Sequence, residues 1–359
     1  MAAEMIEVED SLEQINDYFY KQGWTDGLPV VPPTEPRVNA MLAYTDRDPD
    51  DLMGLIGPRW GKATVRKLAV NAVMAGCLPR FFPIVIAAVE AMLEPDFNLA
   101  GIQATTNPAA PLLILNGPIR HELEVNAGGN VFGQGWRSNA TLGRAIRLIL
   151  LNIGGGEPVT VDKATFGQPG KYTYCIAENE ERSPWPSFSV ERGFTSQAST
   201  VTVVGAAAPH NIIVMGSQSG EDVLSTLADA MTAAGNNLLF FATVTPVVAI
   251  CPEYAALVAR DGFSKDEAKR YLYEHARVPL DRFTPGQRQI VSSWKEHCLV
   301  DGGSVLKVVE RPEDILLLVA GGAGKHAVFL PVFDGRASTK PVARRDGRLI
   351  SSVEDFRSG

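Results

Sequence analysis

Hydrophobic and polar positions follow two different periods along this chain, and the two periods alternate. Apolar residues that recur every three or four positions predict amphipathic helices at 11–21, 64–75, 82–93, 139–151, 221–234, 252–260, 265–276 and 285–296. Ser264 followed by Glu267 is a capping-box signature at the start of one of them. Short strand-like runs lie between the helices, at 111–115, 199–204, 212–215, 246–250, 315–319 and 328–330. This alternation is typical of α/β or α+β architecture.

One order of helix, turn and strand residues occurs twice. In both copies a helical acidic residue is followed, at the same spacing, by an asparagine, and then by a threonine, an apolar strand and a proline. The first copy contains Glu90, Asn98, Thr106, 111–115 and Pro118, and the second contains Asp229, Asn237, Thr245, 246–250 and Pro252. The repetition predicts an internal duplication.

Two small-residue loops extend the same comparison. The segments 204–210 and 320–326 each follow a strand-like run and reach a histidine five residues after a glycine. The chain has five histidines, and two of them, His210 and His326, therefore stand at points that look equivalent. Small residues allow a backbone to approach a ligand closely, and strand ends are where α/β proteins build binding sites.

These repeats divide the chain into four parts. We expect an N-terminal arm at 1–67, a first α/β unit at 68–217, a second at 218–335 and a C-terminal tail at 336–359. The first unit is longer because it carries an insertion with the segments 126–139 and 175–191. The expected fold is two pseudo-repeated α/β units around a shared cleft, with an extended N-terminal arm.

Composition limits the classes of partner. The 359 residues carry a net charge of −8, which argues against nucleic acid because phosphate binding needs a basic face. No apolar run is long enough to suggest a membrane span, and the acidic segment 1–10 does not resemble a signal peptide. The four cysteines are scattered without a CxxC pair, which favours reduced thiols and a cytoplasmic location.

Three residues are candidates for acid/base catalysis. His210 and His326 carry the side chain whose pKa lies nearest neutrality. Glu178 follows a partly apolar segment, 174–177, which would raise its pKa on burial. Two alternatives stay open: each histidine is a structural hydrogen-bonding residue, or the histidines, Glu178 and Cys175 hold a divalent metal. No metal-ligand spacing in the sequence supports the second alternative.

Further polar residues are candidates for holding a ligand. They lie at strand ends and in loops, and they are Asp26, Thr105, Thr106, Asn107, Asn116, Asn130, Arg137, Asn211 and Lys325. Arg137 beside the free N–H groups of a helix start would form an anion site, although a solvated arginine explains it as well. Asp26 is equally a turn residue that caps a backbone amide. Cys175 and Cys251 are candidate thiols, each without a second cysteine nearby.

The segment 321–326, Gly-Gly-Ala-Gly-Lys-His, invites comparison with a nucleotide-binding loop. It has histidine where serine or threonine is needed, and a strand instead of a helix is predicted to follow it. These departures exclude a P-loop ATPase, and no GxGxxG after a strand supports a dinucleotide cofactor. The loop and Lys325 can still hold a carboxylate.

Four segments taken together resemble a poorly characterised family of bacterial proteins. They are Asp-Gly-Leu-Pro-Val-Val-Pro-Pro-Thr at 26–34, Gln-Ala-Thr-Thr at 103–106, Gly-Lys-Tyr-Thr-Tyr-Cys at 170–175 and Gly-Gly-Ala-Gly-Lys-His at 321–326. Proteins of this family can be encoded beside a small protein of the UGSC type, which carries a redox-capable selenocysteine or cysteine. The resemblance implies a bacterial origin and a heteromeric partner, and it implies no particular activity or catalytic residue.

Two hypotheses about function follow. The first is an enzyme, a lyase or hydrolase, that acts on a small polar, carboxylate-bearing molecule at the cleft between the units and forms a homo-oligomer. Polar residues in glycine-lined loops favour it, because a purely structural subunit has little use for them. The second is a non-catalytic or co-catalytic subunit whose segment 24–34 docks a thiol- or selenol-bearing partner of the UGSC type. Thiol redox chemistry at Cys175 or Cys251 has less support in the sequence.

Overall fold

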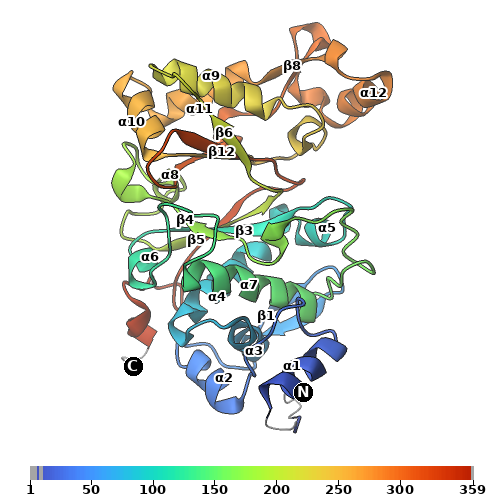
Figure 1. The fold of residues 1–359 in the computed structure, drawn as a ribbon, viewed down its shortest axis with the longest axis vertical. Helices are drawn as coiled ribbons and strands as arrows, with labels where there is room; N and C mark the ends of the chain where they lie inside the picture. The colour runs from blue at the N-terminus through green and yellow to red at the C-terminus, as the bar shows by residue number, and fades with distance from the viewer. Residues whose placement is uncertain (1–5, 8–10, 357–359) are drawn as a thin grey trace.

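Layers of helices and sheets make up most of the molecule (Figure 1). The computed structural model describes residues 6–7 and 11–356. From the top of Figure 1 downward, a layer of helices is followed by one four-stranded sheet, a second four-stranded sheet and another layer of helices. The sheets are therefore covered on their outer faces and pack toward each other on their inner faces.

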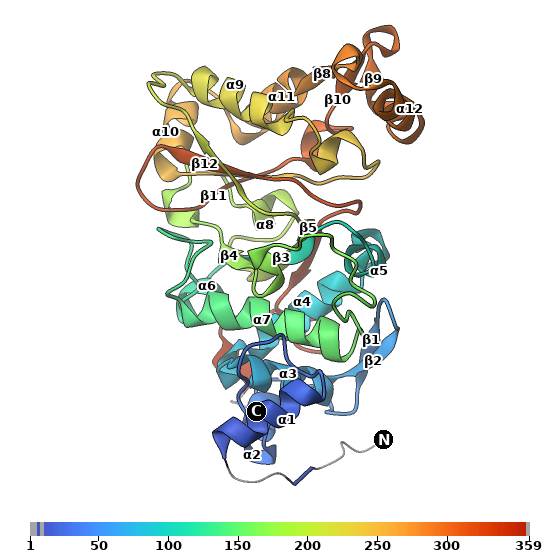
Figure 2. The same cartoon turned by 45° about the vertical axis from the view of Figure 1, so that its right-hand side comes forward.

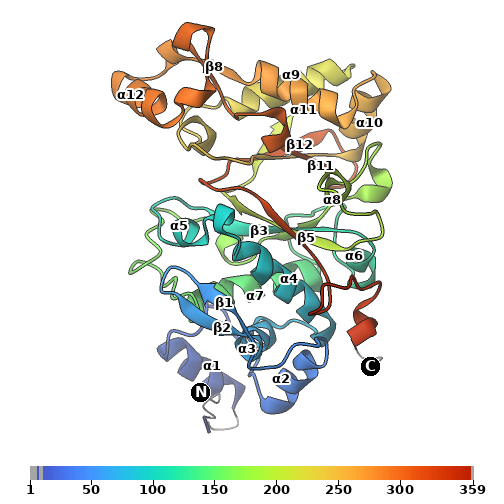
Figure 3. The same cartoon turned by 180° about the vertical axis from the view of Figure 1, so that it is seen from behind.

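The first sheet has the strand order β4-β3-β5-β13. β3 (Ala110–Asn116) runs parallel to β4 (Cys175–Ala177) and antiparallel to β5 (Thr200–Ala206), which in turn is antiparallel to β13 (Ser338–Pro341). Every residue of β3, β4 and β5 is buried, as expected for strands covered on both faces. Helices α3 (Val65–Ala75), α4 (Phe82–Met92) and α7 (Arg137–Asn152) lie below this sheet, which Figure 3 shows from behind.

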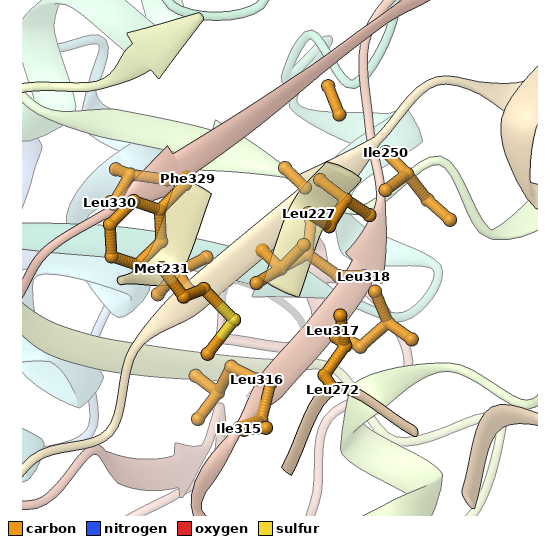
Figure 4. Close-up of a cluster of buried hydrophobic side chains, with 14 of the residues drawn as sticks. Leu227, Met231, Ile250, Leu272, Ile315, Leu316, Leu317, Leu318, Phe329 and Leu330 are labelled. Carbon is orange, nitrogen blue, oxygen red and sulfur yellow. The ribbon is translucent and has the colours of Figure 1, made fainter. Parts of the chain in front are cut away.

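The second sheet has the order β11-β7-β12-β6. β7 (Val247–Ile250) is parallel to β11 (Leu316–Val319) and antiparallel to β12 (His326–Leu330), which is antiparallel to β6 (His210–Ile213). Helices α9 (Gly220–Met231), α10 (Pro252–Arg260) and α11 (Lys265–His275) cover its outer face. Figure 4 shows Leu227 and Met231 of α9 against the strands; burying each such side chain contributes about 1.5–3 kcal/mol.

An interrupted two-stranded ribbon joins the two sheets. β5 leads into β6 and β12 leads into β13, so each of these segments begins in one sheet and ends in the other. At the crossing, Ala206 pairs with Val332, and amide hydrogen bonds from Ala207 to Pro331 and from Phe333 to Gly205 flank that pair. The inner faces of both sheets belong to one hydrophobic core.

The two sheets have the same order of pairings: parallel, antiparallel, antiparallel. In each sheet the strand that has one parallel and one antiparallel neighbour comes after a long helix in the chain: α4 precedes α5 and β3, and α9 precedes β7. Helices together with mixed sheets agree with the expected α/β or α+β class. The division expected at 217/218 does not follow the sheets, because β6 joins the second sheet and β13, from 336–359, joins the first.

The remaining elements lie at the two ends and along the edges of the sheets. At the lower end are α1 (Leu12–Lys21), α2 (Glu35–Leu42) and the hairpin of β1 (Leu52–Ile56) with β2 (Gly61–Thr64); along the edges are α5 (Leu99–Gln103), α6 (Ile119–Glu122) and α8 (Phe188–Glu191). At the upper end, β8 (Arg277–Pro279), β9 (Leu299–Val300) and β10 (Val305–Lys307) form a small sheet beside α12 (Pro285–Trp294), as Figure 2 shows. Among the described residues, no helix is long and apolar enough to span a bilayer.

The helices predicted from the apolar period are confirmed to within a few residues, and the capping box of Ser264 and Glu267 forms at the start of α11. The expected extended arm, in contrast, forms α1, α2 and the β1–β2 hairpin, and α2 packs on α3. The short helices were missed because four or five residues give no periodic signal. β6 and β12 begin earlier than predicted, because their ladder includes His210 and His326.

Candidate functional site

The connections after the two parallel strands of the second sheet meet at one edge. After β11 the chain enters the glycine loop 320–325, and after β7 it reaches Cys251 and the start of α10. The amide of Cys251 donates to the carbonyl oxygen of His326 (3.2 Å), and its Sγ donates to that of Gly324 (2.7 Å). The carboxyl ends of parallel strands are where α/β proteins bind ligands.

The glycine loop is held in place by a second glycine-containing loop. Gly321 donates its amide to the carbonyl of Ala127 (2.8 Å) and has a φ of +92°, which favours glycine. A Cβ added to Gly322 would lie 2.7 Å from the Cα of Gly129, so only a glycine allows these backbones to touch. The loop is thereby fixed on one side, while Lys325 at its far end stays exposed.

A polar pocket of about 370 Å³ lies beside this loop. Its lining comes from the connection after β6, from α10 and from the glycine loop: Ser217, Gln218, Glu253, Tyr254, Leu257, Arg260 and Lys325. The hydroxyl of Tyr254 donates to the carbonyl of Lys325 (2.7 Å) and accepts from the amide of Val214 (3.0 Å), which ties the three lining segments together.

Three charged side chains of this pocket are incompletely paired. Lys325 has no ion-pair partner among the described residues, whereas Arg260 is bound to Asp261 (2.8 Å) and keeps 62% of its side chain exposed. The Oε2 atom of Glu253 is buried, and no hydrogen-bond partner for it exists in the described part of the chain. The pocket therefore offers two cations and one carboxylate to a ligand.

The thiol of Cys251 lies next to this pocket in its protonated form. Burial raises the pKa of Cys251, and the nearby carboxylate of Glu253 raises it further, while the amides of Tyr254 and His326 act in the opposite direction. The thiol donates to the glycine loop, so it anchors that loop instead of serving as an activated nucleophile.

The two candidate histidines begin different kinds of strand. His326 begins β12, an inner strand, and His210 begins β6, the strand at the edge. In the ladder His210 is paired with Phe329 and His326 with Ile213, which separates the histidines by about 10 Å along the strands. Their apparent equivalence in the sequence is therefore wrong. The Nδ1 atom of His326 contacts Oδ1 of Asn211 (3.1 Å), and both residues are exposed.

Glu178 is completely buried at the end of β4. Its Oε2 accepts hydrogen bonds from Nδ2 of Asn116 (2.6 Å) and from the amide of Phe188 (2.8 Å), and Nζ of Lys265 lies 3.7 Å from Oε1. Burial raises the pKa of Glu178, and the charge of Lys265 opposes that rise. Glu178 does not line the pocket at Lys325.

An ion-pair network extends from Glu178 in both directions. On one side Lys265 also binds Glu191 (2.9 Å), and on the other Asn116 donates to Glu180 (3.0 Å). The side chain of Arg120, which is 4% exposed, contacts Glu180 (3.3 Å) and also pairs with Glu181. Glu181 in turn contacts His121. The Oε1 atom of Glu178 and Oδ1 of Asn116 accept no hydrogen bond from the described residues, so Lys265 is the cation that balances the buried charge of Glu178 and holds α11 against the first sheet.

Asp26 is held in a bidentate ion pair with Arg144, with Nε–Oδ2 and Nη2–Oδ1 distances of 2.8 Å. Its side chain is 4% exposed, and Arg144 also donates to the carbonyls of Leu28 and Pro29. Asp26 therefore fastens the segment 24–34 to α7 and is not available to a ligand. Arg137 similarly donates to the carbonyl of Gly76.

The other predicted binding residues lie apart from the pocket at Lys325. Asn130 closes its own loop by donating to the carbonyl of Gln134 (2.8 Å), and Thr106 accepts the amide of Thr165 through its carbonyl (3.0 Å). Asn107 donates to Oδ1 of Asn237 (2.8 Å) in the other half of the molecule. Thr105 lines a different pocket, between Asn98 and Trp294. Cys175 is buried in β4, where burial raises the pKa of its thiol.

Glu253, Tyr254 and Arg260 were not predicted from the sequence. One signal was present: Pro252 starts a helix directly after a buried strand, so the first turn of α10 had to lie at a strand end. The closeness of Lys325 to this helix depends on β7 and β11 being neighbours, which no local pattern reveals.

Within the described residues, no three His, Cys, Asp or Glu side chains are grouped closely enough to hold a metal ion. No protein-family model matches the chain, and no curated protein is significantly similar to it in sequence.

Proposed function

We propose that the pocket beside Lys325 binds a small carboxylate-bearing molecule and that the protein is an enzyme, a lyase or hydrolase using acid/base chemistry. One observation carries the proposal: Lys325, Arg260 and the partnerless Oε2 of Glu253 line a single pocket at the carboxyl ends of parallel strands. A buried polar atom without a partner is costly, and a ligand or an ordered water that pairs with it removes that cost.

The charges suggest a division of roles. Lys325 and Arg260 would hold the carboxylate of the substrate, since both reach the pocket and neither is buried in an ion pair. Glu253 would accept a proton, either from a carbon beside that carboxylate, which leads to elimination, or from a water, which leads to hydrolysis. His326 adjoins Lys325 in the chain and would exchange the proton with solvent, because its ring is exposed.

We also infer that the two halves are pseudo-repeats. The amide of Glu178 donates to Leu115 and that of Ala320 to Ile250, both at 3.1 Å, just after the parallel strands of each sheet. When the two halves are matched by these hydrogen bonds, Ala320 of the second half corresponds to Glu178 of the first. Cys251, which follows Ile250, then corresponds to Asn116. The pocket beside Lys325 would then occur in the second half alone.

Binding of a panel of small mono- and dicarboxylates, each with its uncharged amide as a control, tests the proposal by calorimetry and by NMR detection of turnover. We expect at least one carboxylate to bind and its amide not to bind. Lys325→Met should weaken binding about tenfold or more, the loss of one charge-assisted hydrogen bond, whereas Lys21→Met, an equal change of charge on α1, should not. Glu253→Gln should bind and not turn over. Absence of binding by every carboxylate contradicts the proposal.

A second candidate function is a subunit that docks a UGSC-type partner along the segment 24–34. Leu28 and Val31 support it, because both hydrophobic side chains are exposed on a segment that Arg144 holds rigidly. Co-expression with such a partner, followed by light scattering, distinguishes the two functions and also measures homo-oligomerisation. A complex that Leu28→Ser abolishes supports docking, and a chain that stays uncomplexed opposes it.

A further inference from the structure

We propose that a second pocket, between the two halves of the molecule, binds an organic cation with an apolar body. The pocket measures about 500 Å³. The first half contributes Asn98, Gly101, Ala104 and Thr105, and the second contributes Phe241, Ala242, Trp294, Phe333 and Asp334. It shares no lining residue with the pocket at Lys325, and the proposal does not depend on the function assigned to that pocket.

Aromatic rings form the apolar part of this pocket. The rings of Phe241 and Phe333 lie with their centroids 4.6 Å apart and their planes inclined by 57°. Trp294, at the end of α12, is 54% exposed although it is among the largest apolar side chains of the protein. An exposed aromatic surface beside a cavity marks a site where an apolar group of a ligand can be covered.

One carboxylate supplies the only formal charge of the lining. The Oδ1 atom of Asp334 accepts the amide of Thr243 (2.8 Å), and Nδ2 of Asn98 donates to the carbonyl of Asp334 (2.8 Å). These two contacts fix the residue from both halves. The Oδ2 atom of Asp334 has no hydrogen-bond partner in the described part of the chain, and it remains for a ligand.

The cations near Asp334 are engaged elsewhere. Lys295 is fully buried, and its Nζ donates to the carbonyls of Leu238 (2.7 Å) and Val308 (2.8 Å). Arg336 binds Asp314 at 3.0 Å and lies within 3.9 Å of Glu310. Neither forms an ion pair with Asp334, although the carboxylate of Asp334 acts on Lys295 electrostatically: burial lowers the pKa of that lysine, and Asp334 raises it. Asp334 is therefore the one charged side chain among the described residues that line the pocket.

Aromatic faces and a carboxylate together favour one class of ligand. The faces of aromatic rings attract cations, and a carboxylate in the same pocket adds direct charge complementarity. A neutral aromatic molecule would gain only the apolar contact, and an anion would be repelled by Asp334. A protonated amine or a quaternary ammonium group attached to an apolar body meets all three features of the pocket.

Three probes of similar shape test the inference: 2-phenylethylammonium, 2-phenylethanol and 3-phenylpropionate, titrated into the full-length protein while the indole NMR signals are followed. Trp294→Phe identifies the signal of Trp294. We expect the ammonium to shift that signal and to bind at least about fivefold more tightly than the alcohol, the combined effect of an exposed cation–π contact and a partly exposed ion pair. The carboxylate should bind most weakly.

Asp334→Asn separates charge from shape, because its amide oxygen can still accept the hydrogen bond from Thr243. This variant should bind the ammonium and the alcohol equally, while Asp17→Asn, the same loss of charge on α1, should keep the preference. The inference is overturned if the ammonium leaves the Trp294 signal unchanged at millimolar concentration, if the three probes bind wild type alike, or if Asp334→Asn keeps the preference.

Discussion

The same place in the two sheets is sealed in one and open in the other. At the carboxyl ends of β3 and β4, Asn116 and Glu178 are completely buried, and Asn116 donates to Glu178. Glu178 is also bound by the amide of Phe188 in α8 and lies near Lys265 of α11, although its Oε1 atom and Oδ1 of Asn116 accept no hydrogen bond from the described residues. At the carboxyl ends of β7 and β11, the corresponding connections border a pocket in which Lys325 has no ion-pair partner among the described residues. The order of strand pairing is identical, so pairing alone does not decide which end binds a ligand.

Burial decides it. A charge that is buried must be paired within the protein, and its removal leaves the partner unpaired at a cost of about 3–5 kcal/mol. A charge that borders a pocket is solvated, so its removal changes stability little and changes binding much. The sealed and open ends should therefore respond in opposite ways to matched substitutions.

The largest effect is expected at Lys265, the cation nearest Glu178. Lys265→Met leaves Glu178 buried without a countercharge and should lower the free energy of unfolding by about 3–5 kcal/mol. Urea denaturation measures this loss. Combining Lys265→Met with Glu178→Gln should restore part of the stability, since the unpaired charge is gone. A loss below about 1 kcal/mol is typical of a solvent-exposed ion pair. It would show that Lys265 and Glu178 do not form a buried pair.

Lys295 is a buried lysine of the second half, and the dependence of protein stability on pH tests the effect of its burial. Burial lowers the pKa of Lys295 to about 8 from a normal 10.5, so between these values the unfolded chain binds more protons than the folded one. Stability should therefore rise with pH across that window, by up to roughly 3 kcal/mol from this group. The difference in unfolding free energy between wild type and Lys295→Met, measured from pH 7.5 to 10.5, reports this rise. A constant difference contradicts the assignment.

A smaller difference in stability is expected between variants at the carboxyl ends of β3 and β7. Asn116→Ala removes a hydrogen bond to buried Glu178 and should destabilise the fold by about 1–3 kcal/mol. Cys251→Ala removes the thiol contact to Gly324 and a small part of the core, leaves no buried charge unpaired, and should cost about 1 kcal/mol. Thermal and urea unfolding of both variants give the order, and equal costs would remove the distinction between the two ends.

The sequence predicted the helices and the apolar strands well because their periods are local. It identified apolar neighbours that would raise the pKa of Glu178 on burial, and Glu178 is buried, but it gave no sign of Lys265, since α11 reaches β4 only through tertiary packing. The match between His210 and His326 failed for a related reason. Similar small-residue loops precede both, yet pairing makes one begin an edge strand and the other an inner strand. The crossing of β5–β6 with β12–β13 has no local signature either.

The claim that the open end binds the ligand is tested most directly by one affinity comparison. The tightest-binding carboxylate of the panel is titrated into wild type, Lys325→Met and the double variant Lys265→Met/Glu178→Gln, each first shown to be folded by its unfolding transition. We expect Lys325→Met to keep its stability within about 0.5 kcal/mol and to lose most of its affinity, whereas the double variant should keep its affinity. Affinity that survives in Lys325→Met and is lost in the double variant would place the ligand at the first sheet and contradict the account.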